Sequence, residues 1–203
     1  MIKIEKIQVN YLKENCYFVL DTKQQRAFIV DPGGFPKELK EKFDLMPGKL
    51  EYILLTHGHF DHVYGVSEIK KYTGAKVVLC SQERDFPTTP ELNLSKQVKP
   101  FDVDIFVNDG DRLPFGDYII EVMHTPGHTI GSVCYIIGDN IFSGDTMFLG
   151  CAGRCDLPTG NSSMMQRSLK RLSLLSDKYI VYPGHDDQTT LANEKIRGCL
   201  RKI

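Results

Sequence analysis

Residues 56–62 read Thr-His-Gly-His-Phe-Asp-His, so three imidazoles and one carboxylate fall within seven positions. Residues 50–55, just before them, have the apolar and aromatic character of a buried strand. Neutral imidazoles and ionised carboxylates are the ligands that divalent first-row metals prefer, zinc in particular. The chain is therefore expected to fold so that a strand ends in a turn presenting a group of metal ligands.

Composition limits the kind of protein and its partners. The 203 residues suffice for one domain with a full core, so we predict a single domain over 1–203. The net charge of −1 argues against nucleic acid and against an anionic membrane as partners. No apolar run has membrane-spanning length, and the N-terminal residues lack the apolar segment of a signal peptide. We expect a small-molecule substrate, and the oligomeric state is left open.

The six cysteines are scattered, and no two of them have C-x-x-C spacing. This pattern indicates reduced thiols and a cytoplasmic location rather than a disulfide framework. Cys151 and Cys155 lie near a predicted functional segment, but packing is the favoured interpretation for both.

The first half of the chain alternates strands with short helical segments. Helices are expected over 36–43 and from Val66 to a stop at Gly74. Residues 82–99 are polar and punctuated by proline; they are interpreted as a mobile loop or short helices, with a substrate lid as a hypothesis. Strands are predicted over residues 2–9, 15–20, 26–30, 50–55 and 75–80.

The second half is also rich in strands and ends in helices. One helix is expected to begin with a capping box formed by Ser163 and Gln166, and another to run from residue 192 onward. Strand-rich halves that each end in helices favour two packed sheets with helices outside. Strands are predicted over residues 105–107, 112–115, 118–123, 132–137, 140–142 and 179–182.

Three further predicted strands end in turns that carry histidine or aspartate. His124 and His128 follow strand 118–123, Asp145 follows strand 140–142, and His185 follows strand 179–182. In each turn a glycine permits a tight change of direction. Together with residues 56–62, these strand ends hold every histidine of the chain, which strengthens the prediction of a metal centre.

In order along the chain come His-x-His-x-Asp-His, Pro-Gly-His-Thr, Gly-Asp and a late Gly-His. This order resembles the metallo-β-lactamase superfamily. Residues 143–148, Gly153-Arg154 and Thr189-Thr190 make the chain most similar to the glyoxalase II-like (hydroxyacylglutathione hydrolase-like) enzymes within it. The resemblance implies an α+β fold, an αββα sandwich whose metal site lies at one edge of two packed sheets.

The resemblance also implies a dinuclear site. Asp61 would additionally orient the nucleophile, and the presence of His62 favours two metals over one. Two Zn²⁺ ions are favoured, and iron or manganese also suits the ligands. His124 is interpreted either as a hydrogen-bond partner of a ligand or as a polar strand end. The implied ligands are His57, His59 and His128 for one metal, Asp61, His62 and His185 for the other, and Asp145 as a bridge.

The chemistry that the resemblance implies is hydrolysis of a thioester, such as S-lactoylglutathione or a related acyl thiol, by a hydroxide bridging the metals. Arg154 is a candidate partner for a substrate carboxylate, and a surface role is almost as well supported. Glutathione itself is left open, because Cys155, Asp156 and Asp187 replace residues that glyoxalase II enzymes usually have. The extra C-terminal helical segment that binds glutathione in those enzymes is also expected to be absent.

Two other activities fit the same residues. A persulfide dioxygenase would hold a single iron through His57, His128 and Asp145, a ligand set suited to oxygen chemistry. A lactonase would use nearly the same metal chemistry as a thioesterase. A non-catalytic binding protein is least favoured, since no ligand position is lost. The dinuclear hydrolase is the favoured hypothesis.

Overall fold

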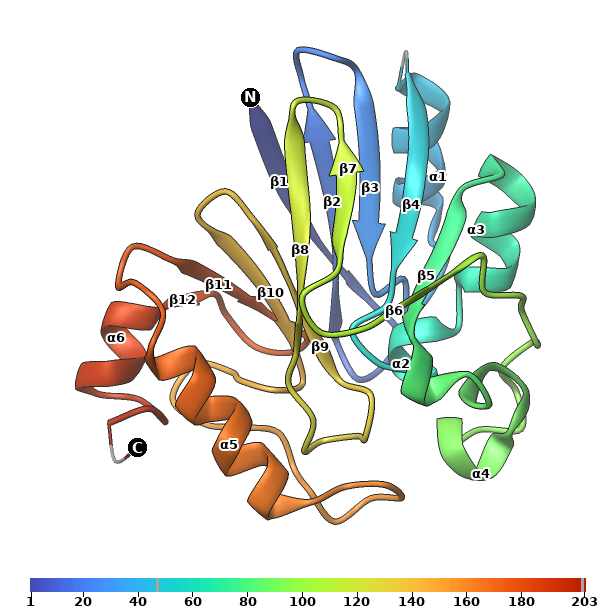
Figure 1. Cartoon of the computed structure of the whole chain (residues 1–203). Helices are drawn as coiled ribbons and strands as arrows, with labels where there is room; N and C mark the ends of the chain where they lie inside the picture. Colours follow the sequence, from blue (N-terminus) through green and yellow to red (C-terminus); the bar gives the residue numbers. More distant parts are fainter. Residues whose placement is uncertain (47, 202) are drawn as a thin grey trace. The chain divides into compact units, whose positions relative to one another are not determined.

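The computed structural model describes residues 1–46, 48–201 and 203 (Figure 1). Within these residues, two six-stranded mixed sheets and several helices form the regular structure, so the predicted α+β class is confirmed. None of the helices in this part of the chain has the length and apolarity needed to cross a bilayer.

The chain divides into two compact units, each with its own sheet. Unit 1 comprises Met1–Leu79 and Glu83–Phe106, and unit 2 comprises Cys80–Gln82 and Val107–Ile203. The single domain over 1–203 stays a prediction.

The sheet of unit 1 has the strand order β1-β2-β3-β4-β5-β6. β1, β2 and β3 pair antiparallel, whereas β3 pairs parallel with β4 and β4 parallel with β5. Because β3 and β4 are parallel neighbours, the turns after both strands lie at the same edge of the sheet. The strands are β1 (Ile2–Val9), β2 (Glu14–Asp21), β3 (Arg26–Val30), β4 (Lys49–Leu54), β5 (Lys76–Cys80) and β6 (Ile105–Val107).

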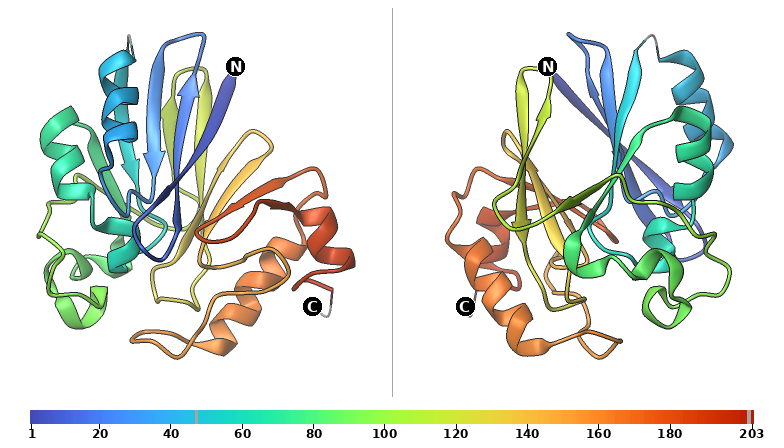
Figure 2. Two further views of the ribbon diagram at one scale, coloured as in Figure 1. Left: turned by 180° about the vertical axis from the view of Figure 1, so that it is seen from behind. Right: turned by 45° about the vertical axis from the view of Figure 1, so that its right-hand side comes forward.

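Helices α1 (Lys37–Leu45) and α3 (Val66–Thr73) lie on one face of this sheet (Figure 2). Leu39 of α1 and Ile69 of α3 are fully buried in the core of unit 1. As predicted, α3 stops at Gly74, whose φ of 69° belongs to the left-handed region.

Short helices precede and follow α3. The expected short helices within residues 82–99 are present as η2 and α4; the proposed lid function stays a prediction. The segments are α2 (Phe60–Val63), η1 (Ser81–Glu83), η2 (Phe86–Thr88) and α4 (Pro90–Asn93).

The sheet of unit 2 has the order β12-β11-β10-β9-β8-β7. Only the β10–β11 pairing is parallel, and β9 is antiparallel to both β8 and β10. β8, β10 and β11 therefore run in the same direction and end at the same edge of the sheet. The strands are β7 (Arg112–Phe115), β8 (Tyr118–His124), β9 (Val133–Ile137), β10 (Asn140–Gly144), β11 (Ile180–Pro183) and β12 (Thr189–Thr190).

Helices α5 (Ser162–Ser173) and α6 (Leu191–Ile196) lie side by side in unit 2 (Figures 1 and 2). The predicted capping box at Ser163 is wrong, because Ser163 is already helical and Asn161 is the N-cap. The Asn161 side chain accepts a hydrogen bond of 2.9 Å from the Met164 backbone N–H. α6 also ends earlier than its apolar pattern suggests, two residues before Gly198.

Replacement of Asn161 by alanine is expected to lower the free energy of unfolding by about 1 kcal/mol, because the cap of α5 is lost. For a chain of this size the melting temperature should fall by roughly 2–4 °C. Ser163→Ala is the matched control and should leave the melting temperature nearly unchanged. Thermal unfolding followed by circular dichroism measures both variants, and equal shifts would contradict the assignment of the cap.

Candidate metal centre

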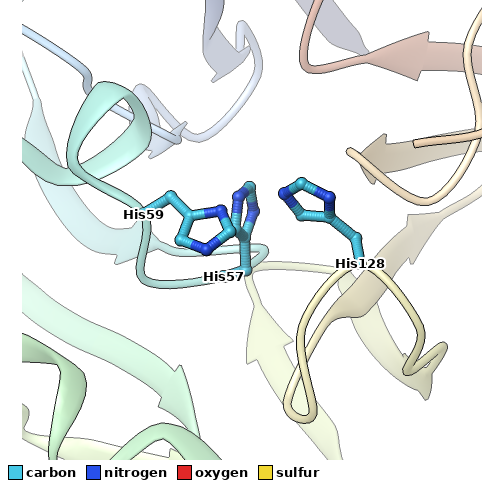
Figure 3. A group of neighbouring side chains, drawn as sticks. All are labelled: His57, His59 and His128. Atoms are coloured by element: carbon cyan, nitrogen blue, oxygen red, sulfur yellow. The ribbon is translucent and has the colours of Figure 1, made fainter. Parts of the chain in front are cut away.

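The turn after β4 gathers the four predicted ligands of unit 1. His57 and His59, drawn in Figure 3, lie in the loop between β4 and α2. Their ring centroids are 4.7 Å apart, and those of His57 and His62 are 4.1 Å apart. Asp61 and His62 belong to the first turn of α2, where the His62 Nε2 atom lies 3.8 Å from Asp61 Oδ2. All three histidines are buried.

Asp31, which follows the parallel neighbour β3, orients two of these histidines. Its Oδ2 atom lies 3.1 Å from His62 Nδ1 and accepts a hydrogen bond of 2.6 Å from the Thr56 hydroxyl. The Thr56 oxygen in turn lies 3.2 Å from His57 Nδ1. A carboxylate only accepts, so His62 donates from Nδ1 and the Thr56 O–H is donated to Asp31. The Thr56 oxygen then accepts from His57 Nδ1.

This arrangement selects an imidazole tautomer that leaves Nε2 able to bind a metal. With the proton on Nδ1, the Nε2 atoms of His57 and His62 carry the lone pair. Sequence reasoning did not single out Asp31, which comes directly after the strand predicted over residues 26–30. It also missed the buried Glu14, whose Oε1 atom lies 3.7 Å from His62 Nδ1. An acidic residue directly after a buried strand was the available signal for Asp31; no signal pointed to Glu14.

The turn after β3 packs closely against α2. A Cβ atom at Gly33 would lie 1.6 Å from the backbone oxygen of Asp61, so only glycine fits there. The Asn10 side chain donates a hydrogen bond of 2.9 Å to the same Asp61 oxygen. Gly65 N–H donates to Pro32 O at 2.9 Å. These contacts hold the backbone of Asp61 in one position.

Unit 2 brings together its own three predicted ligands. Asp145 lies between two histidines: Oδ2 is 3.5 Å from His128 Nε2, and Oδ1 is 3.8 Å from His185 Nε2. His128, also drawn in Figure 3, has its Nδ1 atom 2.8 Å from the backbone oxygen of Arg154. Because a carbonyl only accepts, His128 donates from Nδ1, and its Nε2 carries the lone pair.

Buried hydroxyl groups stabilise the turn after β10. The Thr125 and Thr146 hydroxyls lie 2.9 Å apart, and Ser143 donates to Met147 O at 2.8 Å. A Cβ atom at Gly153 would lie 1.9 Å from the backbone oxygen of Asp145. The glycine of the Gly153-Arg154 pair thus allows the Arg154 carbonyl to approach His128.

Arg154 and His124 are the two predicted site residues that were not assigned as metal ligands, and each contacts other groups of the protein. The exposed Arg154 guanidinium donates two hydrogen bonds of 2.7 Å to Asp156, and these bonds lower the pKa of Asp156 to about 2. His124 ends β8, where its Nε2 atom lies 2.9 Å from Ile130 O. The roles of Arg154 in substrate binding and of His124 beside a ligand stay predictions.

All six cysteines are present as thiols. Burial raises the pKa of the Cys151 and Cys155 thiols, and it raises that of Cys199 to about 12. A thiol with a raised pKa is less often ionised to the reactive thiolate at neutral pH. Cys151 and Cys155 therefore do not have the character of nucleophiles.

We therefore expect iodoacetamide to alkylate Cys151 and Cys155 more slowly than a free-cysteine peptide. Since free cysteine ionises near pH ~8.5, their labelling rates should still rise at about pH 10, where the peptide has levelled off. Mass spectrometry of timed digests measures the rates, with the peptide in the same tube as control. Labelling of Cys151 or Cys155 as fast as the peptide at neutral pH would contradict this expectation.

The metallo-beta-lactamase superfamily model matches residues 10–185 of this chain, a range that includes all seven predicted ligands. Hydroxyacylglutathione hydrolase GloC of Haemophilus influenzae is 32% identical over 209 residues, covering 96% of this chain and 95% of the relative. The crystal structure of BLEG-1 B3 metallo-beta-lactamase superposes with a TM-score of 0.87 at 30% identity, covering 98% of this chain and 99% of that one. TTHA1623 in a di-iron-bound form has a TM-score of 0.85 at 32% identity, covering 97% and 99% of the two chains.

Proposed function

Because this chain belongs to the metallo-beta-lactamase superfamily, we propose that it hydrolyses a thioester with two divalent metal ions bound by seven side chains. The metallo-β-lactamase fold and the glyoxalase II-like resemblance predicted from sequence are confirmed. The observation that carries the thioester proposal is the 32% identity to a hydroxyacylglutathione hydrolase over nearly the full length of both chains.

The donor set suits the proposed metals. His57, His62 and His128 are fixed with the proton on Nδ1, which leaves Nε2 as the ligand atom. Imidazole nitrogens with carboxylate oxygens are typical ligands of zinc, and Zn²⁺ is the metal that we propose. The proposed ligands are His57, His59 and His128 for one ion, Asp61, His62 and His185 for the other, and Asp145 shared by both.

When bound, divalent ions supply Lewis acidity and lower the pKa of a coordinated water. The residues of the chain contribute orientation. With metal bound, the Asp61 carboxylate would accept a hydrogen bond from the attacking water. The Asn10 and Gly33 contacts hold the backbone of Asp61 in place. Asp31 and the Arg154 carbonyl keep three imidazoles in the ligating tautomer. A thiol ionises near ~8.5, so a thiolate leaves without a dedicated protein acid.

Elemental analysis of the purified protein, followed by kinetics on S-lactoylglutathione, a small acyl thioester and a lactone, tests this function. We expect two zinc ions per chain and turnover of a thioester that a chelator abolishes and zinc restores. One iron per chain with oxygen uptake on glutathione persulfide would replace the hydrolase by a dioxygenase. Turnover of the lactone alone would replace the thioesterase by a lactonase.

We further propose a cytoplasmic enzyme with a small-molecule substrate and without nucleic-acid or membrane partners. Six cysteines present as thiols fit a reducing compartment, and a net charge of −1 supplies no basic surface for polyanions.

A further inference from the structure

Unit 1 contains a cavity of about 380 Å³ that is bordered by Asp61. The turn between β1 and β2 contributes Tyr11, and α2 with the residue after it contributes Phe60 and Tyr64. Ser95 and Gln97, from the segment after α4, also line the cavity. Since Asp61 is a proposed metal ligand and orients the water, a molecule in this cavity lies beside the reacting groups.

Both walls of the cavity are held by asparagine side chains. Asn10 donates to Asp61 O at 2.9 Å and accepts from Leu12 N–H at 2.9 Å, which fixes the β1–β2 turn. The buried Asn93 donates to Phe86 O at 2.9 Å and accepts from Ser95 N–H at 2.9 Å. The Ser95 hydroxyl oxygen accepts from Gln97 N–H at 3.1 Å. The segments that form the walls of the cavity are therefore fixed by hydrogen bonds.

The lining has a distinct chemistry. Asp61 is its one charged residue among the described residues, and no lysine, arginine or histidine borders the cavity. Phe60, Tyr11 and Tyr64 supply aromatic surface, while the Gln97 amide and the Ser95 hydroxyl supply hydrogen-bonding groups. A carboxylate placed here would find no lysine, arginine or histidine side chain in the lining to pair with. A neutral chain of alkyl and amide groups could pack its alkyl groups against the aromatic rings and form hydrogen bonds from its amides to the polar side chains of the lining.

Arg154 is a predicted partner for a substrate carboxylate. The contacts of its side chain also favour an uncharged substrate over a carboxylate. Its guanidinium already makes two hydrogen bonds of 2.7 Å to Asp156. A substrate carboxylate would have to displace Asp156 to gain this cation.

We propose that the cavity bordered by Asp61 binds the thiol arm of the substrate and selects an uncharged alkyl–amide arm over the charged glutathione tripeptide. This proposal rests on the proposed thioester hydrolysis. Gln97 and Ser95 hydrogen-bond to the amide of the arm, and the rings of Phe60 and Tyr64 pack against its methylene groups.

The test compares kcat/KM for S-lactoyl-N-acetylcysteamine, which is uncharged, with kcat/KM for S-lactoylglutathione. The metal-loaded wild-type enzyme should favour the uncharged ester by about tenfold or more, the effect expected of a complementary uncharged site. Gln97→Lys places a cation in the cavity and should shift the ratio towards the glutathione ester by about fivefold. Gln166→Lys makes the same change on the exposed face of α5 and should leave the ratio unaltered. A wild-type preference for the glutathione ester, or equal shifts in both variants, would overturn the proposal.

Binding to the metal-free protein supplies a readout that does not depend on catalysis. Saturation-transfer NMR should detect S-methyl-N-acetylcysteamine, with weaker transfer from S-methylglutathione, and Tyr64→Ala should reduce the first signal. If neither ester is hydrolysed but this binding pattern holds, the thioesterase function fails and the cavity assignment stands. If thioesters are hydrolysed but both thioethers bind equally, the selectivity proposal fails alone.

Discussion

Asp145→Asn is expected to lower kcat/KM for thioester hydrolysis by about 10³-fold, because a bound metal contributes several kcal/mol of transition-state stabilisation and each ~1.4 kcal/mol corresponds to a factor of ten. The Asp145 carboxylate faces both His128 and His185, at 3.5 and 3.8 Å, and we propose that it is shared by both ions. A neutral amide is a poor substitute for a shared anionic ligand. Metal content per chain should therefore fall together with activity.

Asp139→Asn provides the matched control, since Asp139 is an exposed residue in the turn between β9 and β10 and pairs with Lys178. That variant should retain its full metal content and its activity. Elemental analysis and steady-state kinetics on the same samples separate the two cases. An Asp145→Asn enzyme with two metals and wild-type kcat/KM would remove Asp145 from the proposed site.

Asp31→Ala is expected to lower the stability of the protein strongly. The buried carboxylate accepts hydrogen bonds from Thr56 N–H, from the Thr56 hydroxyl and from His62. Loss of these bonds should lower the free energy of unfolding by about 3 kcal/mol, because each buried donor left unsatisfied costs roughly 1–3 kcal/mol. The melting temperature should then fall by roughly 6–12 °C, at about 2–4 °C per kcal/mol.

The same substitution should weaken metal binding by about 10–100-fold, since groups that orient metal-ligating histidines have effects of this size. Calorimetry of the metal-free protein measures the stability change, and competition with a chromophoric chelator measures the affinity. Asp102→Ala, at an exposed position of unit 1, should change neither quantity. An unaltered melting temperature with unaltered affinity would show that Asp31 does not orient His57 and His62.

Local patterns were sufficient to predict most strands and the ligand candidates. The strand before residue 56 and the strands before His128, Asp145 and His185 were each identified from apolar runs that end in turns. The parallel pairing of β10 and β11 could not be read in this way, because it depends on contacts between residues about forty positions apart. The same limit explains why Asp31 was missed, since its partners Thr56 and His62 are 25 and 31 residues away.

Helix ends were less predictable than strands. Ser163 and Gln166 have the spacing of a capping box, yet Asn161 lies two residues earlier and its side chain caps α5 instead. Serine and asparagine are both good N-cap residues by type. In the folded unit the Asn161 backbone N–H donates a hydrogen bond to Gly127 O, a contact between residues distant in the sequence that accompanies the use of Asn161 as the cap. The apolar residues Cys199 and Leu200 continue the pattern of α6 and pack against the core of unit 2. They do so beyond the end of the helix, which stops at Ile196.

The contact between His128 and the Arg154 carbonyl has a consequence for the divergence of related enzymes. Every amino acid supplies a main-chain oxygen, so the side chain at position 154 is free to vary without disturbing the imidazole that this oxygen orients. Mutation at this position can therefore explore new substrate contacts while metal ligation is retained, whereas Asp31 performs the same task with its side chain and leaves no such freedom.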